Sequence, residues 1–394
     1  MDKLSSKKSI KHFEIVLKIS ERCNINCDYC YVYNKGNSIA NDSPPRISEK
    51  NIIHLVDFLQ RACLEYEIRD LQIDLHGGEP LLMKKEHFAK ICSLLISGNY
   101  SGSNISLALQ TNGTLVDDEW ISLFEKYSVH VSISIDGPKH INDRHRLDTK
   151  GRSTYEDTVR GLRMLQMAYH QGRLLAAPGI LCVANAQANG AEIYRHFVDE
   201  LGVYGFDFLV PDDSYKDAHI DPIGIGRFLN EALDEWVKDD NSKIFIRLFQ
   251  THIASLLGAK KVGVLGHTPS VTGAYACTIG SDGFIRVDDT LRSTSDKIFN
   301  IIGHVSAINL SDVINSDQFQ EYSAIGQSLP SECEGCIWEN ICGGGRIMNR
   351  FSPEDRFKRK SVYCYSIRSF LSRASAHLLD MGIKEERIMA AISQ

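Results

Sequence analysis

The sequence predicts an α/β fold in which a partial barrel of six parallel strands precedes a small cysteine-rich unit. Strand-like and helix-like segments alternate through the first 215 residues, an order typical of parallel strands joined by crossover helices. About 200 residues suit a partial barrel whose chemistry lies at the carboxyl ends of its strands. Beyond residue 270 the segments shorten and contain five of the eleven cysteines.

The expected strands have apolar alternation and end at turn residues; they cover residues 13–19, 70–80 with its glycine turn, 105–113, 129–137, 176–185 and 204–211. The expected helices have apolar spacings of three and four; the first begins at Ser48 as its N-cap, and the others cover 84–97, 117–127, 155–169 and 190–201. We also expect one or two helices over 223–258 and an amphipathic helix over 365–390.

These patterns divide the chain into three parts. Residues 1–215 form the partial barrel, residues 216–270 a helical bridge, and residues 271–394 a cysteine-rich domain that ends in a helix. The last part has too little apolar sequence for a large core of its own, so we expect a metal centre to stabilise it.

Composition excludes several classes of function. The chain of 394 residues has a net charge of −6 and an isoelectric point near 6.2, so we expect no nucleic-acid partner. The most apolar segment, 174–184, is too short to cross a bilayer, and the amino-terminal stretch lacks the apolar core of a signal peptide. We therefore expect a cytoplasmic protein with no membrane partner.

In the reducing cytoplasm, eleven cysteines favour metal ligation over disulfides. Cys63, Cys92 and Cys182 lie singly in apolar patterns and are expected to be small buried hydrophobic side chains.

The first cysteine group is Cys23, Cys27 and Cys30, in the stretch SERCNINCDYCY. Three thiolates on one loop can bind three irons of a cubane. The fourth iron then stays open, as in a catalytic metal site that keeps one position for its substrate. Zinc is the alternative, but the nearest downstream histidine is His54, on a predicted helix.

This spacing, with Tyr29 before the last cysteine, resembles the signature of the radical SAM superfamily. The resemblance implies a radical SAM barrel whose [4Fe-4S] cluster binds S-adenosyl-L-methionine at the open iron. Three further stretches fit in order: Gly-Gly-Glu-Pro at 77–80, Gln-Thr-Asn-Gly at 110–113, and Ser-Ile-Asp-Gly at 134–137 followed by Asn-Asp-Arg-His-Arg at 142–146. The cofactor-binding residues so implied are Gly77, Gly78, Glu79, Asn112, Ser134, Asp136 and Arg146. Glu79 would hold the methionine amino group, Ser134 the ribose and Arg146 the carboxylate, whereas alone Arg146 would read as a surface charge.

The second cysteine group is Cys333, Cys336, Cys342 and Cys364. Four thiolates can ligate a cluster completely, which makes this centre structural or electron-relaying. A four-cysteine zinc site is the alternative on spacing alone. The group resembles the SPASM extension of radical SAM enzymes that modify peptides and proteins.

Two ligands of the SPASM pattern are missing. Asp288 stands where its Gly-x4-Cys element has a cysteine after Gly283, and Arg346 stands four residues after Cys342. Both would belong to the first auxiliary cluster, so we predict two [4Fe-4S] clusters in total, one SAM-binding and one auxiliary. Cys277 is then an orphan near the substrate cavity or a buried thiol. Asp288 or Asp289 is a candidate catalytic base or substrate anchor where the cluster is lost; the alternative is a turn carboxylate.

The stretches CDYCYVYN, LHGGEPLL, GILCVAN and DGFIRVDDTLR resemble the cyclophane-forming radical SAM/SPASM maturases of ribosomally synthesised peptides (RiPPs). The resemblance implies an oxidoreductase that removes a β-hydrogen from a precursor peptide and joins that carbon to an aromatic ring. It also implies an electron donor such as flavodoxin or ferredoxin.

Two other functions remain open. An anaerobic sulfatase-maturing enzyme would oxidise cysteine or serine to formylglycine, and its reaction begins with removal of the same β-hydrogen. The incomplete set of SPASM ligands and the sequence HGGEP at residues 76–80 count against this function. A non-catalytic iron–sulfur or zinc-stapled binding protein would explain the cysteines but not the other motifs.

Overall fold

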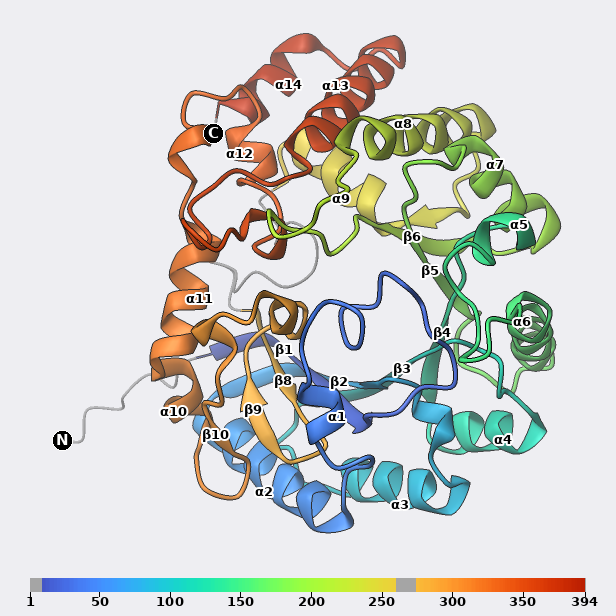
Figure 1. Cartoon of the computed structure of the whole chain (residues 1–394), viewed down its shortest axis with the longest axis vertical. Helices are drawn as coiled ribbons and strands as arrows, with labels where there is room; N and C mark the ends of the chain where they lie inside the picture. The colour runs from blue at the N-terminus through green and yellow to red at the C-terminus, as the bar shows by residue number, and fades with distance from the viewer. Residues whose placement is uncertain (1–8, 260–273, 394) are drawn as a thin grey trace.

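The computed structural model describes residues 9–259 and 274–393. Within these residues the strands form a single ten-stranded sheet, in the order β10-β9-β8-β1-β2-β3-β4-β5-β6-β7. The neighbours from β1 to β7 are all parallel, and helices α2, α3, α4 and α6 lie outside this curved half of the sheet (Figure 1). The predicted α/β fold class, in which parallel barrel strands alternate with helices, is therefore confirmed.

All six predicted barrel strands are present in sequence order; they are β1 (Ser9–Ser20), β2 (Glu67–Gly77), β3 (Asn104–Thr111), β4 (Val129–Ser134), β5 (Gly179–Val183) and β6 (Gly205–Leu209). A seventh strand, β7 (Phe245–Ile246), pairs in parallel with β6. It has only two residues, too few to give a periodic pattern in the sequence.

The predicted barrel helices are also present, as α2 (Glu49–Glu65), α3 (Lys85–Ile96), α4 (Asp118–Lys126), α6 (Tyr155–His170) and α7 (Gly190–Arg195). Ser48 caps α2 as predicted, because its hydroxyl accepts a hydrogen bond from Asn51 N at 3.1 Å. Helix α7 continues into one π-helical turn, His196–Glu200. Two short helices, α1 (Ile39–Asp42) and α5 (Lys139–Asn142), belong to the loops above the strands.

The bridge contains two helices, α8 (Pro222–Asp239) and α9 (Arg247–Leu256). The carboxyl-terminal unit has α10 (Leu310–Asn315), α11 (Asp317–Gln327), α12 (Glu339–Cys342), α13 (Cys364–Asp380) and α14 (Glu385–Ile392). The prediction of a single helix over 365–390 is wrong. The chain turns between α13 and α14 at Gly382, whose φ of +85° suits glycine.

Three strands of the carboxyl-terminal unit join the barrel sheet. Strand β8 (Ala274–Ile279) pairs in parallel with β1, and β9 (Phe284–Arg286) and β10 (Gly303–His304) follow as antiparallel neighbours. The predicted domain boundaries remain a prediction, and the stretches 1–8, 260–270 and 271–273 of those domains, with residue 394, lie outside the described residues.

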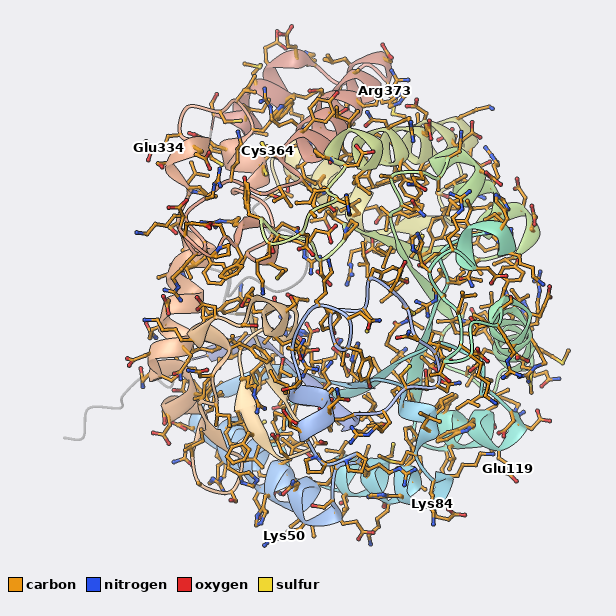
Figure 2. The ribbon with its side chains drawn as sticks, in the orientation of Figure 1. Lys50, Lys84, Glu119, Glu334, Cys364 and Arg373 are labelled. Atoms are coloured by element: carbon orange, nitrogen blue, oxygen red, sulfur yellow. The ribbon has the colours of Figure 1, made fainter. Side chains whose placement is uncertain are left out.

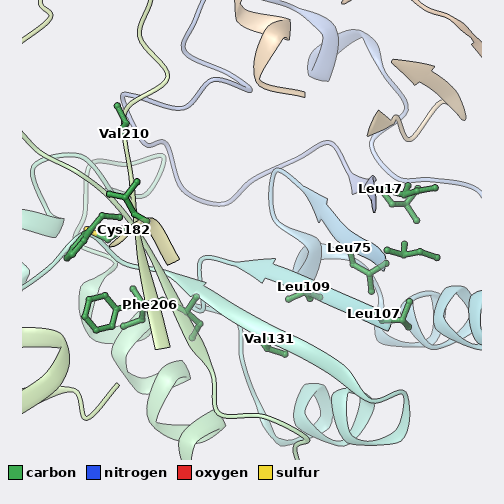
Figure 3. Close-up of a cluster of buried hydrophobic side chains, with 14 of the residues drawn as sticks. Leu17, Leu75, Leu107, Leu109, Val131, Cys182, Phe206 and Val210 are labelled. Atoms are coloured by element: carbon green, nitrogen blue, oxygen red, sulfur yellow. The ribbon is translucent and has the colours of Figure 1, made fainter. Parts of the chain in front are cut away.

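The core lies between the strands and the outer helices. On β1 the side chains of Phe13, Ile15, Leu17 and Ile19 are buried, and Leu17, Leu75, Leu109 and Val131 continue this layer from strand to strand (Figure 3). Cys63, Cys92 and Cys182 belong to the same core, as expected. No helix among the described residues is long and apolar enough to cross a membrane.

Candidate active site at the carboxyl ends of the strands

The first cysteine group lies on the loop that follows β1. Cys30 N donates a hydrogen bond to Cys27 O at 3.1 Å, and Asn34 N donates to Cys30 O at 2.7 Å, so the loop is compact. All three cysteines are free thiols. The donor set therefore fits a cubane with one iron left open.

Burial keeps these thiols neutral in the metal-free protein. It raises the pKa of Cys23 to about 12 and that of Cys27 to about 11, and it raises the pKa of Cys30 as well. Across residues 9–259 and 274–393, no three side chains of Cys, His, Asp or Glu converge as the ligands of a single metal ion do. A cubane takes its thiolates on separate irons, and its assembly would release the thiol protons.

The glycine turn after β2 holds the cysteine loop by close backbone contact. Gly78 N donates to Ser20 O at 2.8 Å, and Glu79 N donates to Arg22 O at 2.8 Å. A methyl group added at Gly78 would lie 2.0 Å from the Tyr33 hydroxyl and 2.5 Å from Arg22 O. Only glycine allows the turn to approach the segment that leads into Cys23.

Glu79 is fully buried and ties the turn to the end of β3. Its Oε1 accepts hydrogen bonds from Leu81 N at 2.9 Å and Thr111 Oγ1 at 2.7 Å, and its Oε2 accepts one from Asn112 N at 2.8 Å. Burial raises the pKa of Glu79, although these donors oppose the rise. Both carboxylate oxygens thus have protein partners, and direct contact with the cofactor stays a prediction.

Asn112 and Ser134 lie at the ends of neighbouring strands. Asn112 Nδ2 donates to Asn24 Oδ1 at 2.8 Å and lies 4.0 Å from Cys23 Sγ. Ser134 Oγ accepts a hydrogen bond from Gln110 Nε2 at 2.7 Å. Asn112 therefore contacts the cysteine loop directly, and Ser134 ends the neighbouring strand β4.

A buried chain of hydrogen bonds joins the remaining predicted SAM residues to that loop. Arg146 Nη1 donates to the Tyr29 hydroxyl at 2.8 Å, and this hydroxyl donates to Asp136 Oδ2 at 2.6 Å. Asp136 Oδ1 accepts from Val183 N at 3.1 Å. Arg146 is only 6% exposed, so it is not the solvated surface charge that the sequence alone would suggest.

The second cysteine group comes together between α12 and α13. Cys342 ends α12, Cys364 begins α13, and the loop of Cys333 and Cys336 precedes them (Figure 2 labels Cys364). Burial raises the pKa of Cys342 to about 12, and the other three thiols are close enough to add to that rise. All four are free thiols and fit a fully ligated cluster.

Charged groups stand where the SPASM pattern has its missing ligands. Arg346 Nη1 lies 2.7 Å from Asp212 Oδ1 and donates to Val210 O at 3.0 Å. Burial raises the pKa of Asp212, and Asp288 adds to this rise. Asp288 also caps the following 3-10 helix, because its Oδ1 accepts hydrogen bonds from Thr290 N and Thr290 Oγ1, both at 2.9 Å.

Asp289 lies in a buried charged cluster beside the first cysteine loop. Its Oδ2 forms an ion pair with Lys18 and accepts a hydrogen bond from the Tyr31 hydroxyl at 2.8 Å. Its Oδ1 lies 3.1 Å from Arg292 Nε. Burial alone would raise the pKa of Asp289, but Arg292 and Lys18 hold it well below its usual range.

Lys18, Tyr31 and Arg292 were not among the residues predicted from the sequence. One signal was available for Lys18, which interrupts the apolar run IVLKIS near the end of β1. Cys277, whose position was left open, lies on β8 beside Ile15 of β1 and is 1% exposed. Burial raises the pKa of Cys277 to about 12.

Comparisons with known proteins show that the chain is similar to one domain family and, over most of its length, to enzymes of two bacteria. Residues 17–179 match the model of the radical SAM superfamily. The chain is 24% identical over 389 residues to a cysteine-type anaerobic sulfatase-maturating enzyme of Clostridium perfringens (strain 13 / Type A), covering 93% of this chain and 97% of that protein. It is also 24% identical over 364 residues to a serine-type enzyme of Bacteroides thetaiotaomicron, covering 86% of this chain and 83% of that protein.

A solved structure has the same fold. Native anSMEcpe with bound AdoMet and Cp18Cys peptide aligns with a TM-score of 0.78 at 24% identity, covering 94% of this chain and 99% of that chain. The expected cyclophane-forming function is contradicted by these matches, because the two relatives described above, aligned over 93% and 86% of this chain, are sulfatase-maturating enzymes of cysteine and serine type. Resemblance of short stretches misled the sequence analysis, since motifs that bind a shared cofactor do not specify the substrate.

Proposed function

We propose that this chain, which carries a radical SAM domain over residues 17–179, oxidises the β-carbon of a cysteine or serine residue in a peptide or protein to an aldehyde. The product residue is formylglycine. The similarity that carries this proposal extends across the barrel and the carboxyl-terminal unit, since it covers 93% of this chain.

The cysteines of the chain form two groups, according to the centre that they would hold. Cys23, Cys27 and Cys30 would hold the cluster that binds S-adenosyl-L-methionine, and Cys333, Cys336, Cys342 and Cys364 would hold the auxiliary cluster. When bound, the first centre supplies a carbon radical able to remove hydrogen from an unactivated carbon, and the second supplies a one-electron acceptor. A protein donor such as flavodoxin or ferredoxin would provide the initiating electron.

The protein residues orient these groups and manage the proton. The substrate side chain loses its β-hydrogen atom, one further electron and the proton of its thiol or hydroxyl group. We assign that proton to Asp289, because its carboxylate is ionised and lies beside Tyr31, the residue after Cys30. A thioaldehyde formed from cysteine then takes up water and releases hydrogen sulfide, whereas serine gives the aldehyde directly.

Asp288 has a different part in this proposal. Its Oδ1 is occupied as a helix cap, and its Oδ2 accepts a hydrogen bond from the Tyr322 hydroxyl at 3.4 Å. Together with Arg346 and Asp212, it fills the region where relatives of the SPASM pattern place another cluster. We assign to Asp288 the shaping of the substrate cavity, and to Asp289 the acceptance of the proton from the substrate's thiol or hydroxyl group.

The test uses anaerobically reconstituted protein with S-adenosyl-L-methionine, dithionite and matched peptides that differ only by cysteine, serine or alanine at one position. The expected product from the cysteine peptide has lost sulfur and gained an aldehyde, which a hydrazide reagent traps. The serine peptide loses two hydrogens and is trapped in the same way, whereas a crosslinked product would lose two hydrogens without reacting.

Three outcomes are distinguishable. An aldehyde from either peptide supports the proposal. Formation of 5′-deoxyadenosine without any aldehyde, across peptides drawn from sulfatases and from genes near this one, overturns the assigned reaction. Absence of deoxyadenosine from iron-loaded protein overturns the enzyme assignment and returns the chain to a non-catalytic iron–sulfur protein.

A further inference from the structure

Lys18 is a buried cation to which the proposed reaction assigns no role. It is the inward-facing residue near the end of β1, and its side chain has no exposed surface. Burying an ammonium group costs several kcal/mol unless partners compensate it. Its partners are Asp289, with which it forms an ion pair, and His76, whose Nδ1 lies 3.0 Å from Lys18 Nζ. Lys18 Nζ also donates a long hydrogen bond to the Tyr31 hydroxyl at 3.5 Å.

The sheet fixes this contact between Lys18 and His76. The two residues are direct partners in the parallel pairing of β1 with β2, so their side chains project from the same face. His76 immediately precedes Gly77, which is held against the backbone of Ser20. The strand ends therefore allow little freedom in the separation of ammonium and imidazole.

Lys18 contacts both the buried carboxylate of Asp289 and the less buried imidazole of His76. Asp289 is 4% exposed and Lys18 is fully buried, whereas His76 is partly exposed. The ammonium group of Lys18 is a donor to both neighbours, and Nδ1 of a neutral imidazole is an acceptor. Burial also lowers the pKa of Lys18, which eases transfer of one of its protons.

A proton that Asp289 receives from the substrate needs a path away from this carboxylate. Arg292 and Lys18 both stabilise its ionised form, so a proton received from substrate is not retained there. Arg292 cannot carry it onward, because a guanidinium group does not release a proton in proteins. The Tyr31 hydroxyl also contacts Asp289, but burial raises the pKa of Tyr31 well above its ordinary value, so this hydroxyl holds its proton. Lys18 is therefore the partner through which the proton can leave. Glu21, another buried carboxylate, lies 3.9 Å from Arg292 Nη1.

We propose that Lys18 and His76 form a proton relay that clears Asp289 after each oxidation. A proton passes from Lys18 Nζ to His76 Nδ1, and the amine left on Lys18 takes the proton from Asp289. The carboxylate and ammonium are thereby restored, and His76 releases one proton through its other ring nitrogen. Exchange of the remaining ring proton with solvent then moves it from Nδ1 back to the other ring nitrogen, so that Nδ1 is again an acceptor. The relay rests on the proposed function, since it requires a substrate proton at Asp289.

The test compares the yield of aldehyde per 5′-deoxyadenosine in wild type, His76→Ala and His76→Gln. The relay predicts that the alanine variant loses about tenfold to a hundredfold in aldehyde yield, while deoxyadenosine formation stays within about twofold. Added imidazole should restore the yield in His76→Ala. A packing role alone would not respond to imidazole.

Lys18→Arg provides a second variant that keeps the charge beside Asp289 but cannot pass a proton. It should retain iron and deoxyadenosine formation and lose aldehyde, without rescue by imidazole. In protein without reductant, ¹⁵N NMR should show His76 Nδ1 as an unprotonated acceptor, and Lys18→Met should change this signal.

An unchanged aldehyde yield in His76→Ala, in protein whose wild type makes aldehyde, overturns the relay and leaves the proposed function intact. Absence of aldehyde from wild type overturns the proposed function instead. If His76→Ala fails to fold, the yield and imidazole response of His76→Gln and Lys18→Arg decide the question.

Discussion

A hydrogen bond between Tyr29 and Asp136 connects two segments of the site that are far apart in the sequence. The Tyr29 hydroxyl donates a 2.6 Å hydrogen bond to Asp136 Oδ2 across a sequence separation of 107 residues. It thereby fixes the cysteine loop to the end of β4 and presents its oxygen to Arg146 as an acceptor.

Removing that hydroxyl should cost both stability and turnover. In Tyr29→Phe, Arg146 and Asp136 lose a shared partner in a buried site, so the free energy of unfolding should fall by about 1–3 kcal/mol. Formation of 5′-deoxyadenosine should slow as well. Tyr169→Phe, at a tyrosine 38% exposed on α6, is the matched control and should change neither quantity. Equal behaviour of the two variants would contradict the role of Tyr29.

Iron content should distinguish two clusters from three. Reconstituted protein should bind about eight irons, and replacing Cys23, Cys27 and Cys30 by alanine should leave about four and abolish deoxyadenosine formation. Replacing Cys333, Cys336, Cys342 and Cys364 should also leave about four while preserving deoxyadenosine formation. Cys277→Ala is the control and should not change iron content. About twelve irons in wild type would mean that other residues replace the missing ligands.

The glycine turn offers a test of how the loop is held. Gly78→Ala should lower iron binding at the first site, because its methyl group would overlap the Tyr33 hydroxyl and Arg22 O. Gly205→Ala adds the same methyl group where nothing lies within 4 Å, so it should bind iron normally. Iron content measured after identical reconstitution compares them. Normal iron in Gly78→Ala would show that the loop tolerates displacement.

Asp289 and Asp288 should differ in their effects when changed to asparagine. Asp289→Asn leaves Lys18 and Arg292 without their shared buried anion and should lower the free energy of unfolding by about 3–5 kcal/mol. It should also abolish aldehyde formation and spare cleavage of S-adenosyl-L-methionine. Asp288→Asn keeps an oxygen that can cap the helix, so its stability should change by less than about 1 kcal/mol. Aldehyde formation by Asp289→Asn at the wild-type rate would exclude it as the base.

Acid should destabilise the fold through His252 on α9. This imidazole is buried against the ring of Phe370, with centroids 5.5 Å apart, and burial lowers its pKa from the ordinary 6.5. Below pH 6.5 the unfolded chain binds a proton that the folded chain does not, so stability falls as the pH falls towards the folded pKa. Denaturant titrations of the metal-free protein should show this dependence weakened in His252→Gln and unchanged in His170→Gln on α6. An identical pH dependence in wild type and His252→Gln would contradict the assignment.

The sequence was sufficient for the barrel strands because each has its own alternation and a turn at its end. It could not show that β8 lies beside β1, since pairing between distant strands leaves no local pattern. The helix break at Gly382 was visible as a glycine, but the apolar spacing on both sides outweighed it in the prediction. Strand β7 is too short for any periodic signal.

The candidate site was predictable where its residues are neighbours in sequence. Cys23, Cys27 and Cys30 form one motif, and Gly77 to Glu79 form another. The cluster around Asp289 draws Lys18 from β1 and Arg292 from the carboxyl-terminal unit, and their pairing depends on the completed fold. Substrate choice was the least predictable property, because it depends on the cavity shape rather than on the cofactor motifs.

The pairing of β8 with β1 also determines which fragments of the protein should remain soluble. Any fragment that ends before residue 274 leaves the edge of β1 from His12 to Leu17 without its partner strand. Such an open edge, with unsatisfied amide and carbonyl groups, invites self-association. A barrel expressed by itself should therefore precipitate or form oligomers. Supplying residues 260–394 as a separate polypeptide should restore solubility by covering that edge.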